Sequence, residues 1–358
     1  MESTHRYVMS VYREDRTPIT QVPADMDWFP AGQCARFEGI RRGCLSPDGA
    51  VQTAIEPVWH PAAGEPYVDG VRVEVSQAGA EAYRYDVPLL YFELLAKQVS
   101  AQLVQQSELA AGEYYRYVVA AYPCQPAPAE ATPAKGLVVE SITPPLPLTE
   151  APLEEFITGA AAVAQPDPLD MPAILHERVL AEATELASKA APYETGGILI
   201  GHLHRDLASG EIFLVITAQI PAEHTGTPHM TKLTFTPQTW SAGQAAIDLR
   251  GRDELTAGWW HSHTYMAETC KDCRKAKEGS CQVDAAFMSA DDIQLHRTCF
   301  PGAYSIALVV GQSPCSGTTR SVFGWKQGMV TARGFHVLNQ SRTQAADGAV
   351  VTGGRRNA

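Results

Sequence analysis

A proline-rich stretch near the middle of the chain limits what the sequence can fold into. Residues 124–152 include CQPAPAEATPAKG and TPPLPLTEAP, with prolines every few positions. Proline fixes φ and removes a backbone donor, so such a stretch cannot continue a helix or a central strand. We therefore predict an extended linker over residues 124–170, with a domain on each side. A chain of 358 residues is long enough for two domains.

Residues 1–123 are expected to form a small α+β domain of unknown role. Leucine and valine recur near a 3.6-residue spacing between residues 88 and 109, which predicts a helix. A role in binding a partner and a purely structural role both remain open. Apolar and polar residues alternate in short segments, which predicts strands over residues 7–12, 51–59, 71–75 and 113–122.

Residues 171–340 are expected to form the second domain, a mixed α/β (α+β) sheet flanked by helices, followed by a flexible tail over residues 341–358. Three segments are predicted to be helical: residues 173–190, 238–249 and a helix that begins at Ser289 and ends before Pro301. Five apolar runs are predicted to be strands: residues 196–205, 212–220, 255–263, 304–310 and 322–325.

The composition favours some partners over others. The formal net charge of -12 at pH 7 provides no basic surface for nucleic acid. The first residues lack a basic region followed by an apolar one, and the apolar runs are shorter than a membrane span. We therefore expect a cytoplasmic protein that binds neither nucleic acid nor membrane.

Two histidines, His261 and His263, end one of the predicted strands in the sequence GWWHSHTYM. Residues two apart on a strand point to the same face, so both imidazoles can bind one zinc ion. The alternative is two unrelated polar residues at a strand end. A catalytic zinc site needs a third protein ligand, and Asp292 in the sequence SADD is a candidate. Ser289 and Asp292 also resemble a helix capping box, which is compatible with metal binding.

Water activated at such a site needs a base that takes up its proton and delivers it. Glu194 directly precedes the apolar strand that includes GGILIGH and is the candidate base. Considered alone, Glu194 would be an ordinary solvated residue between a helix and a strand.

Together these residues resemble the signature of the JAMM (MPN+) zinc metalloproteases, whose domain is of the JAB or MPN type. A glutamate before a G-G-x-L-x-G strand, H-S-H at the end of a later strand and S-x-x-D at a helix start occur here in that order. The resemblance implies that His261, His263 and Asp292 bind a catalytic Zn²⁺. It also implies that Glu194 is the acid/base and that Ser289 helps to stabilise the oxyanion.

Two features depart from the pattern of that family. The family usually has proline after the second histidine, where this chain has Thr264. The family also has about seven residues between that histidine and the serine, whereas 25 residues, 264–288, intervene here. The resemblance therefore implies an insertion of about eighteen residues. We expect this insertion to change the loop geometry and the access of substrate, and to leave the set of metal ligands unchanged.

The insertion carries CKDCRKAKEGSC, in which Cys270, Cys273 and Cys281 form a C-x2-C-x7-C pattern. Exposed clustered thiols oxidise readily, so we predict that these cysteines hold a second, structural zinc ion. Cys299 is the leading candidate for the fourth ligand, and His296 is another. Three free thiols or a redox role are the alternatives.

The resemblance also implies a substrate class. Most enzymes of that family remove ubiquitin or ubiquitin-like proteins from their conjugates, so an isopeptidase or precursor-processing protease is expected. Associated activating and conjugating enzymes are the expected further partners. The alternatives are C-terminal trimming of a sulfur-carrier protein with the ubiquitin fold, and a non-catalytic scaffold. A DNA-associated relative is disfavoured by the negative net charge.

Overall fold

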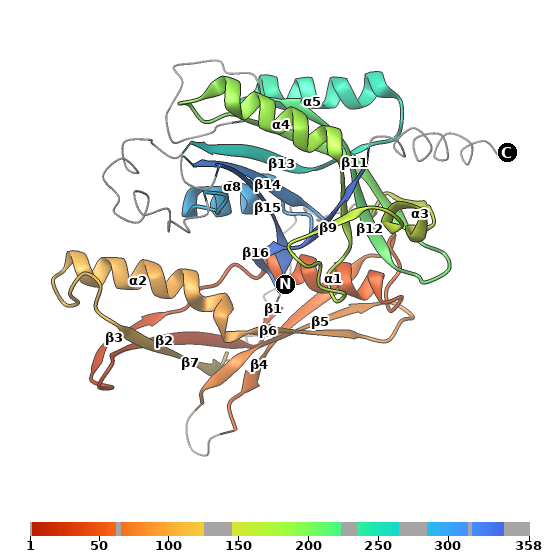
Figure 1. Cartoon of the computed structure of the whole chain (residues 1–358). Helices are drawn as coiled ribbons and strands as arrows, with labels where there is room; N and C mark the ends of the chain where they lie inside the picture. The colour runs from red at the N-terminus through yellow and green to blue at the C-terminus, as the bar shows by residue number, and fades with distance from the viewer. Residues whose placement is uncertain are drawn as a thin grey trace, which may run out of the picture. The chain divides into compact units, whose positions relative to one another are not determined.

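The structure is a computed structural model, which describes residues 2–61, 66–124, 145–222, 235–264, 285–313 and 317–339. It divides into two compact units, each described here by itself. Unit 1 comprises Met1–Leu146 and Gln327–Met329, and unit 2 comprises Pro147–Lys326 and Val330–Ala358. Both units combine helices with sheets, which confirms the expected α/β class (Figure 1).

Unit 1 contains one sheet of order β1-β4-β5-β6 and another of order β3-β2-β7. Strand β5 presents valines to the core at alternate positions, as the period of a strand requires. The elements are β1 (Glu2–Ser3), β2 (His5–Arg13), β3 (Pro18–Pro23), α1 (Phe29–Arg41), β4 (Val51–Trp59), β5 (Val68–Gln77), β6 (Tyr83–Pro88), a 3-10 turn (Leu89–Phe92), α2 (Glu93–Gln105) and β7 (Tyr115–Pro123).

Unit 2 is built on a ten-stranded mixed sheet with the order β16-β15-β14-β13-β11-β12-β10-β17-β9, and β8 also pairs with β11. Strand β13 runs antiparallel to β11 and parallel to β14, so it is paired on both sides. The elements are β8 (Leu148–Glu150), α3 (Leu153–Ile157), β9 (Ala161–Val163), β10 (Ala173–His176), α4 (Glu177–Ala190), β11 (Gly196–Arg205), β12 (Ile212–Pro221), α5 (Pro237–Arg250), β13 (Leu255–Thr264), α8 (Ala290–Cys299), β14 (Ile306–Ser313), β15 (Gly317–Lys326), β16 (Met329–Arg333) and β17 (Phe335–Leu338).

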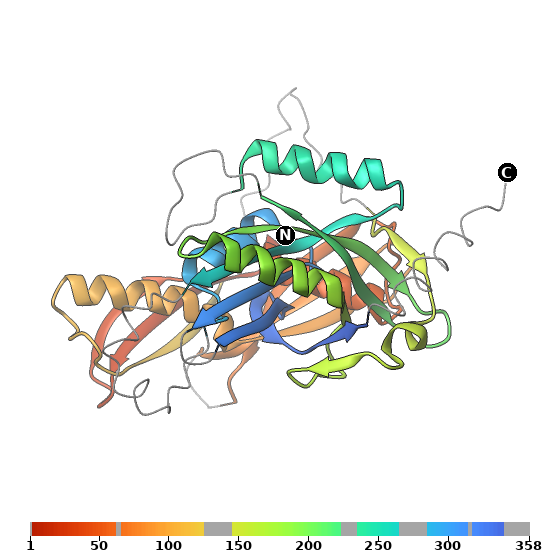
Figure 2. The ribbon, with the colours of Figure 1, turned by 45° about the horizontal axis from the view of Figure 1, so that its top comes forward.

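The helices of unit 2 lie on both faces of this sheet. On one face, Trp260 donates a hydrogen bond to Gln219 at 3.0 Å, and Gln219 donates to Glu182 of α4 at 3.4 Å. On the other face, Trp259 belongs to a buried cluster that includes residues of α5 and α8. Figure 2 shows the light green helix α4 in front of the strands of unit 2. The expected mixed sheet flanked by helices is therefore confirmed, and neighbouring positions of β13 face different helices.

The helix predicted over residues 173–190 begins later than expected. Its first four residues form β10, and the helix starts at Glu177. Strand β10 is fully buried between β12 and β17, both parallel to it. A short apolar run fits a buried strand as well as a helix, and here tertiary pairing decides for the strand.

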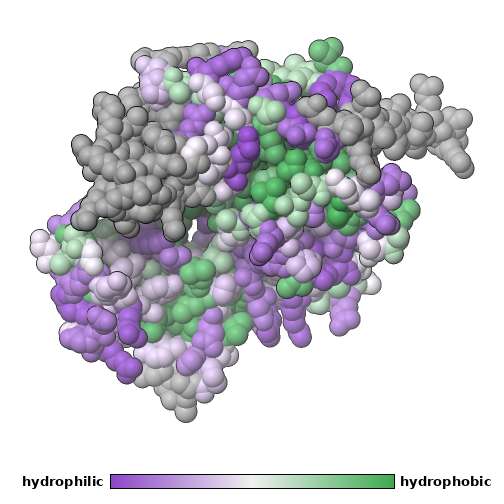
Figure 3. Space-filling model, viewed as in Figure 1, coloured by the Kyte–Doolittle hydropathy of each residue, from purple (hydrophilic) through white to green (hydrophobic). Residues whose placement is uncertain are grey.

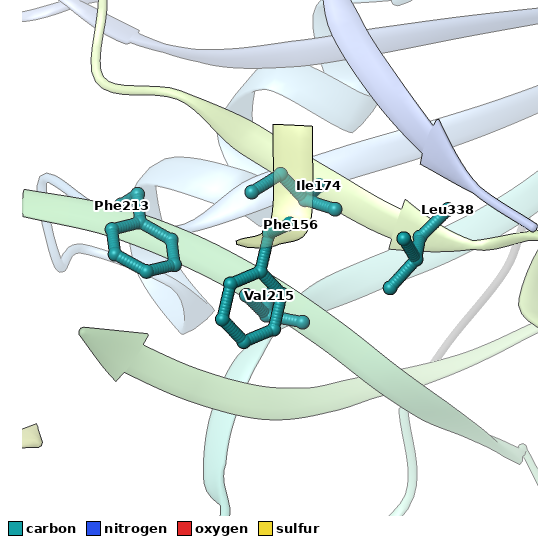
Figure 4. Packing of buried hydrophobic residues seen from close by; sticks show 5 residues of the cluster. All are labelled: Phe156, Ile174, Phe213, Val215 and Leu338. Atoms are coloured by element: carbon teal, nitrogen blue, oxygen red, sulfur yellow. The ribbon is translucent and has the colours of Figure 1, made fainter. Parts of the chain in front are cut away.

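The linker expected over residues 124–170 is shorter in the structure, because residues 148–163 contribute β8, α3 and β9 to unit 2. Strand β8 pairs with β11 from Leu203 to Arg205, beyond the point where β13 leaves β11. Short segments at such positions tolerate neighbouring prolines, because proline is excluded mainly from central strands. Figure 4 shows the buried cluster that holds α3 on β10, β12 and β17: Phe156, Ile174, Phe213, Val215 and Leu338.

Hydrophilic residues are interspersed with separate apolar areas on the face of the molecule drawn in Figure 3. None of the helices in the described part of the chain is long and apolar enough to cross a membrane.

Candidate metal centre

Strand β13 carries the two histidines on the face that α8 covers. Trp259, His261 and His263 alternate with residues that point to the α4 side, because successive strand side chains face opposite ways. His261 is paired with Gly196 of β11 and Val309 of β14. Both imidazoles are buried, so a rigid central strand holds two nitrogen ligands in a site with little access to water.

The third residue of the group comes from the first turn of α8. Ser289 is the N-cap of this helix, and its Oγ accepts a hydrogen bond from the Asp292 backbone N–H at 3.2 Å. The Asp292 carboxylate accepts in return from the Ser289 backbone N–H at 2.8 Å. This reciprocal capping box satisfies two N–H groups that would otherwise lack partners at a helix start. It also fixes the carboxylate in the direction of the histidines.

The three side chains converge as a metal site requires. The two Nε2 atoms of His261 and His263 lie 2.9 Å apart, and the Asp292 oxygens lie 3.4 and 3.3 Å from them. Tetrahedral zinc with bonds of about 2.0–2.1 Å separates its ligand atoms by about 3.3 Å. The spacing and the nitrogen and oxygen donors therefore fit zinc. Among the described residues, these three form the group of histidine, cysteine or acidic side chains that could hold a metal.

The protonation tendencies of the group also suit a cation. Burial by itself would raise the pKa of Asp292, but hydrogen bonds with His261 and His263 outweigh it and hold this pKa far below its ordinary value. Burial lowers the pKa of His261, which favours the neutral imidazole that binds metals. For His263, burial acts in the same direction, but the nearby Asp292 carboxylate prevails and raises the pKa. The carboxylate is thus ionised and attracts positive charge.

Glu194 lies close to the site because it is two residues before Gly196, the first residue of β11, which is paired with His261. The next residue, Thr195, is bound on both backbone groups by Ser262. The Ser262 N–H donates to the Thr195 carbonyl at 2.8 Å, and the Ser262 Oγ accepts from the Thr195 N–H at 3.0 Å. Burial raises the pKa of Glu194 to about 7. The nearby His263 lowers this pKa and Asp292 raises it, each by less than burial does. The carboxyl group is therefore half-buried, close to the ligands, and suited to exchange protons near neutral pH.

Two contacts of the histidines were not anticipated from the sequence. The Trp259 ring stacks on His261 with centroids 4.6 Å apart and planes 13° apart. The exposed ring of Phe287 lies 4.6 Å from the ring of His263. The strand period alone could have placed Trp259 beside His261, because the two residues are two positions apart. No comparable signal identifies Phe287, which follows the long insertion.

The predicted second metal site cannot be placed. Cys270, Cys273 and Cys281 lie outside the described residues. Cys299, the leading fourth ligand, is a free, partly buried thiol packed on the Trp259 cluster. His296 is buried, and its Nδ1 already accepts a hydrogen bond from Trp259 at 3.0 Å, so only Nε2 remains for another partner. The cysteine site stays a prediction.

Comparison with known proteins supports the fold family. Residues 176–269 match the family described as prokaryotic homologs of the JAB domain. This match includes both histidines and Glu194 but ends before Asp292. A search of curated proteins finds no match.

Two solved structures are similar in sequence only weakly. One is the solution structure of protein DSY2949 from Desulfitobacterium hafniense, with 19% identity, a TM-score of 0.31, and coverage of 47% of this chain and 92% of that one. The other is the solution structure of a protein from Salinibacter ruber, with 13% identity, a TM-score of 0.27, and coverage of 44% and 87%. Both TM-scores are too low to support conclusions about this chain. The family match supports a JAB/MPN-type domain within unit 2.

Proposed function

We propose that unit 2 is a zinc-dependent hydrolase that cleaves peptide or isopeptide bonds at the C-terminus of ubiquitin or a ubiquitin-like protein. The observation that carries the proposal is the convergence of two buried histidines and an ionised aspartate beside a half-buried glutamate whose pKa is about 7. A scaffold protein would have no need for a carboxyl group held at such a pKa next to three metal-ligand side chains.

In this proposal His261, His263 and Asp292 would hold the zinc ion. When bound, zinc polarises a substrate carbonyl and makes water a stronger acid and nucleophile. Glu194 takes up the proton that the attacking water loses. It then delivers that proton to the leaving amine, which must be protonated before the C–N bond breaks. Burial favours the protonated form of this carboxyl group and a nearby cation favours the ionised form, so the same group can accept and donate a proton.

Ser289 has a separate role in the proposed reaction. Its Oγ accepts from the Asp292 N–H through one lone pair, and the hydroxyl, which also hydrogen-bonds the Asp292 carboxylate, can turn its proton toward a substrate oxygen. That proton can stabilise the negative charge that develops on the carbonyl oxygen. Loss of one such donor typically costs about 10²–10³ in turnover.

The substrate class rests on the resemblance to the JAMM enzymes. An extended, glycine-rich C-terminal tail is the expected ligand, because such a tail can pair with an exposed strand edge. Trimming of a sulfur-carrier protein uses the same chemistry on a similar tail. The two activities differ in the group that is removed, so substrate profiling separates them.

The test compares zinc content with hydrolysis in the full-length protein. The substrates are ubiquitin with a fluorogenic amide at its C-terminal glycine and a panel of bacterial ubiquitin-like proteins with extended tails. We expect Asp292→Ala to lose both zinc and activity, and Glu194→Gln to keep zinc and lose hydrolysis. Glu185→Gln on the exposed face of α4 is the matched control and should retain both.

Full activity in zinc-loaded Glu194→Gln protein would remove the glutamate from the mechanism. Full activity in zinc-free wild-type protein would exclude the metal from the mechanism. A zinc-loaded wild-type protein that cleaves none of these tails would favour a non-catalytic scaffold.

A further inference from the structure

Within the described part of the chain, His261, the first histidine of the metal group, lacks the usual second anchor. A metal-bound imidazole normally donates its other N–H to a carboxylate, carbonyl or water, which fixes the plane of the ring. The Nδ1 atom of His261 is buried and has no hydrogen-bond partner among the described residues. The plane of this ring can then be restrained by contacts with its faces.

Trp259 supplies that contact through the face of its ring. The indole and the His261 imidazole are nearly parallel, 13° apart, with centroids separated by 4.6 Å, and both residues are fully buried. Stacked aromatic pairs at this distance are attractive and resist tilting of either ring. The stack restrains the plane of the imidazole only as well as the indole itself is held.

The indole is held by His296 of α8. Trp259 donates from Nε1 to Nδ1 of His296 at 3.0 Å, and His296 is fully buried. Burial lowers the pKa of His296 to about 3, so its Nδ1 is an acceptor at neutral pH. His296 lies four residues after Asp292, which places both on the same side of α8. One face of this helix thus presents the third metal ligand and the anchor of the ring that stacks on the first ligand.

We propose that Trp259 and His296 are positioning residues that orient His261 for zinc. This inference rests on the proposed function, because it concerns the same metal group. Packing alone would be the competing explanation, since Trp259 also lies against Phe300 and Phe235. Packing predicts lower stability in the variants with an unchanged metal site, whereas positioning predicts altered coordination in a protein that is still folded.

The test measures zinc affinity of the full-length protein by chelator competition and the visible absorption spectrum of its cobalt-substituted form. His296→Leu removes the acceptor and should weaken zinc binding about 10–100-fold, the range typical of lost outer-shell partners. Trp259→Phe keeps a ring but loses the N–H donor, and should change zinc affinity and the cobalt spectrum in the same direction. His296→Gln offers a side-chain oxygen to the indole and should restore most of the affinity.

His204→Leu is the matched control. His204 is also a buried imidazole with a pKa lowered to about 3, and its Nδ1 has one hydrogen bond, with Thr149 at 2.8 Å. It lies outside the metal group, so its loss should reduce stability without altering zinc affinity or the cobalt spectrum.

The outcomes separate this inference from the proposed function. A wild-type protein that binds no zinc would overturn both. A zinc-binding wild type with folded His296→Leu or Trp259→Phe variants of unchanged affinity and spectrum would overturn the positioning role alone. An equal loss of affinity in His204→Leu would also overturn it, because general destabilisation would then account for the effect.

Discussion

Glu194 should make the metal-free protein less stable at neutral and alkaline pH, and Glu194→Gln should raise the free energy of unfolding there. Burial raises the pKa of this carboxyl group from 4.5 to about 7. Below pH 4.5 the group is protonated in both the folded and unfolded states, and it has no effect. As pH rises from 4.5 to 7, the unfolded state releases the proton first, so stability falls. Each pKa unit corresponds to about 1.4 kcal/mol, which sets an upper limit of about 3 kcal/mol at pH 8.

The assay is urea unfolding of chelator-treated protein, followed by tryptophan fluorescence at pH 5 and pH 8. We expect Glu194→Gln to raise the free energy of unfolding by up to about 3 kcal/mol at pH 8 and by about 1 kcal/mol or less at pH 5. Glu185→Gln, on the exposed face of α4, should give no gain at either pH. Added zinc should reduce the gain, because a nearby cation favours the ionised carboxylate.

A Glu194→Gln variant no more stable than the wild type at pH 8 would refute the reasoning. The carboxyl group would then be as well solvated in the folded protein as in the unfolded chain. Its proposed role as a proton carrier near neutral pH would lose its physical basis.

Three further outcomes are expected. Ser262→Ala removes the Oγ that accepts from the Thr195 N–H next to Glu194, so hydrolysis should fall about 10–100-fold through displacement of Glu194 while zinc content stays unchanged. Loss of zinc together with activity would argue against this role. Limited proteolysis should cut first within residues 124–152, and first cleavage inside 190–260 would contradict the predicted domain boundary. Zinc analysis should find two ions in the wild type and one ion after Cys270, Cys273 and Cys281 are replaced by serine. A wild-type count of one ion, with these thiols freely titratable, would exclude the second site.

The central strands of unit 2 could be predicted closely, because their apolar runs are long and bounded by turn residues. The predicted segments 196–205 and 255–263 correspond to β11 and β13 with a difference of at most one residue. Helix α1 was missed for an identifiable reason. Its buried positions are occupied largely by small residues and are spread around the helix, so no apolar stripe appears in the sequence.

The members of the metal group could be named from the sequence, but their supporting contacts could not. Residue type and order select His261, His263 and Asp292, and the strand period explains why the two histidines face the same way. The hydrogen bond between Trp259 and His296 joins residues 37 positions apart. It depends on how α8 packs on β13, and local patterns carry no information about that packing.

The long insertion should affect substrate access without affecting the zinc ligands, because both of its ends are fixed next to the site. His263 is paired with Gly311 of β14, and a Cβ added at Gly311 would lie 2.4 Å from the Ala285 backbone. The chain therefore returns beside the residue it left, and α8 then starts at its own capping box.

A two-glycine replacement of residues 265–284 would leave seven residues between His263 and Ser289 and should close this gap. We expect the shortened protein to bind zinc with wild-type affinity, because β13 and α8 hold the ligands independently of the loop. Cleavage of a small C-terminal glycine amide and of a ubiquitin-like protein substrate should respond differently, since only the larger substrate extends beyond the metal group. A folded, shortened protein that loses zinc would show that the insertion takes part in ligand geometry, and equal rates on both substrates relative to wild type would show that it has no part in substrate selection.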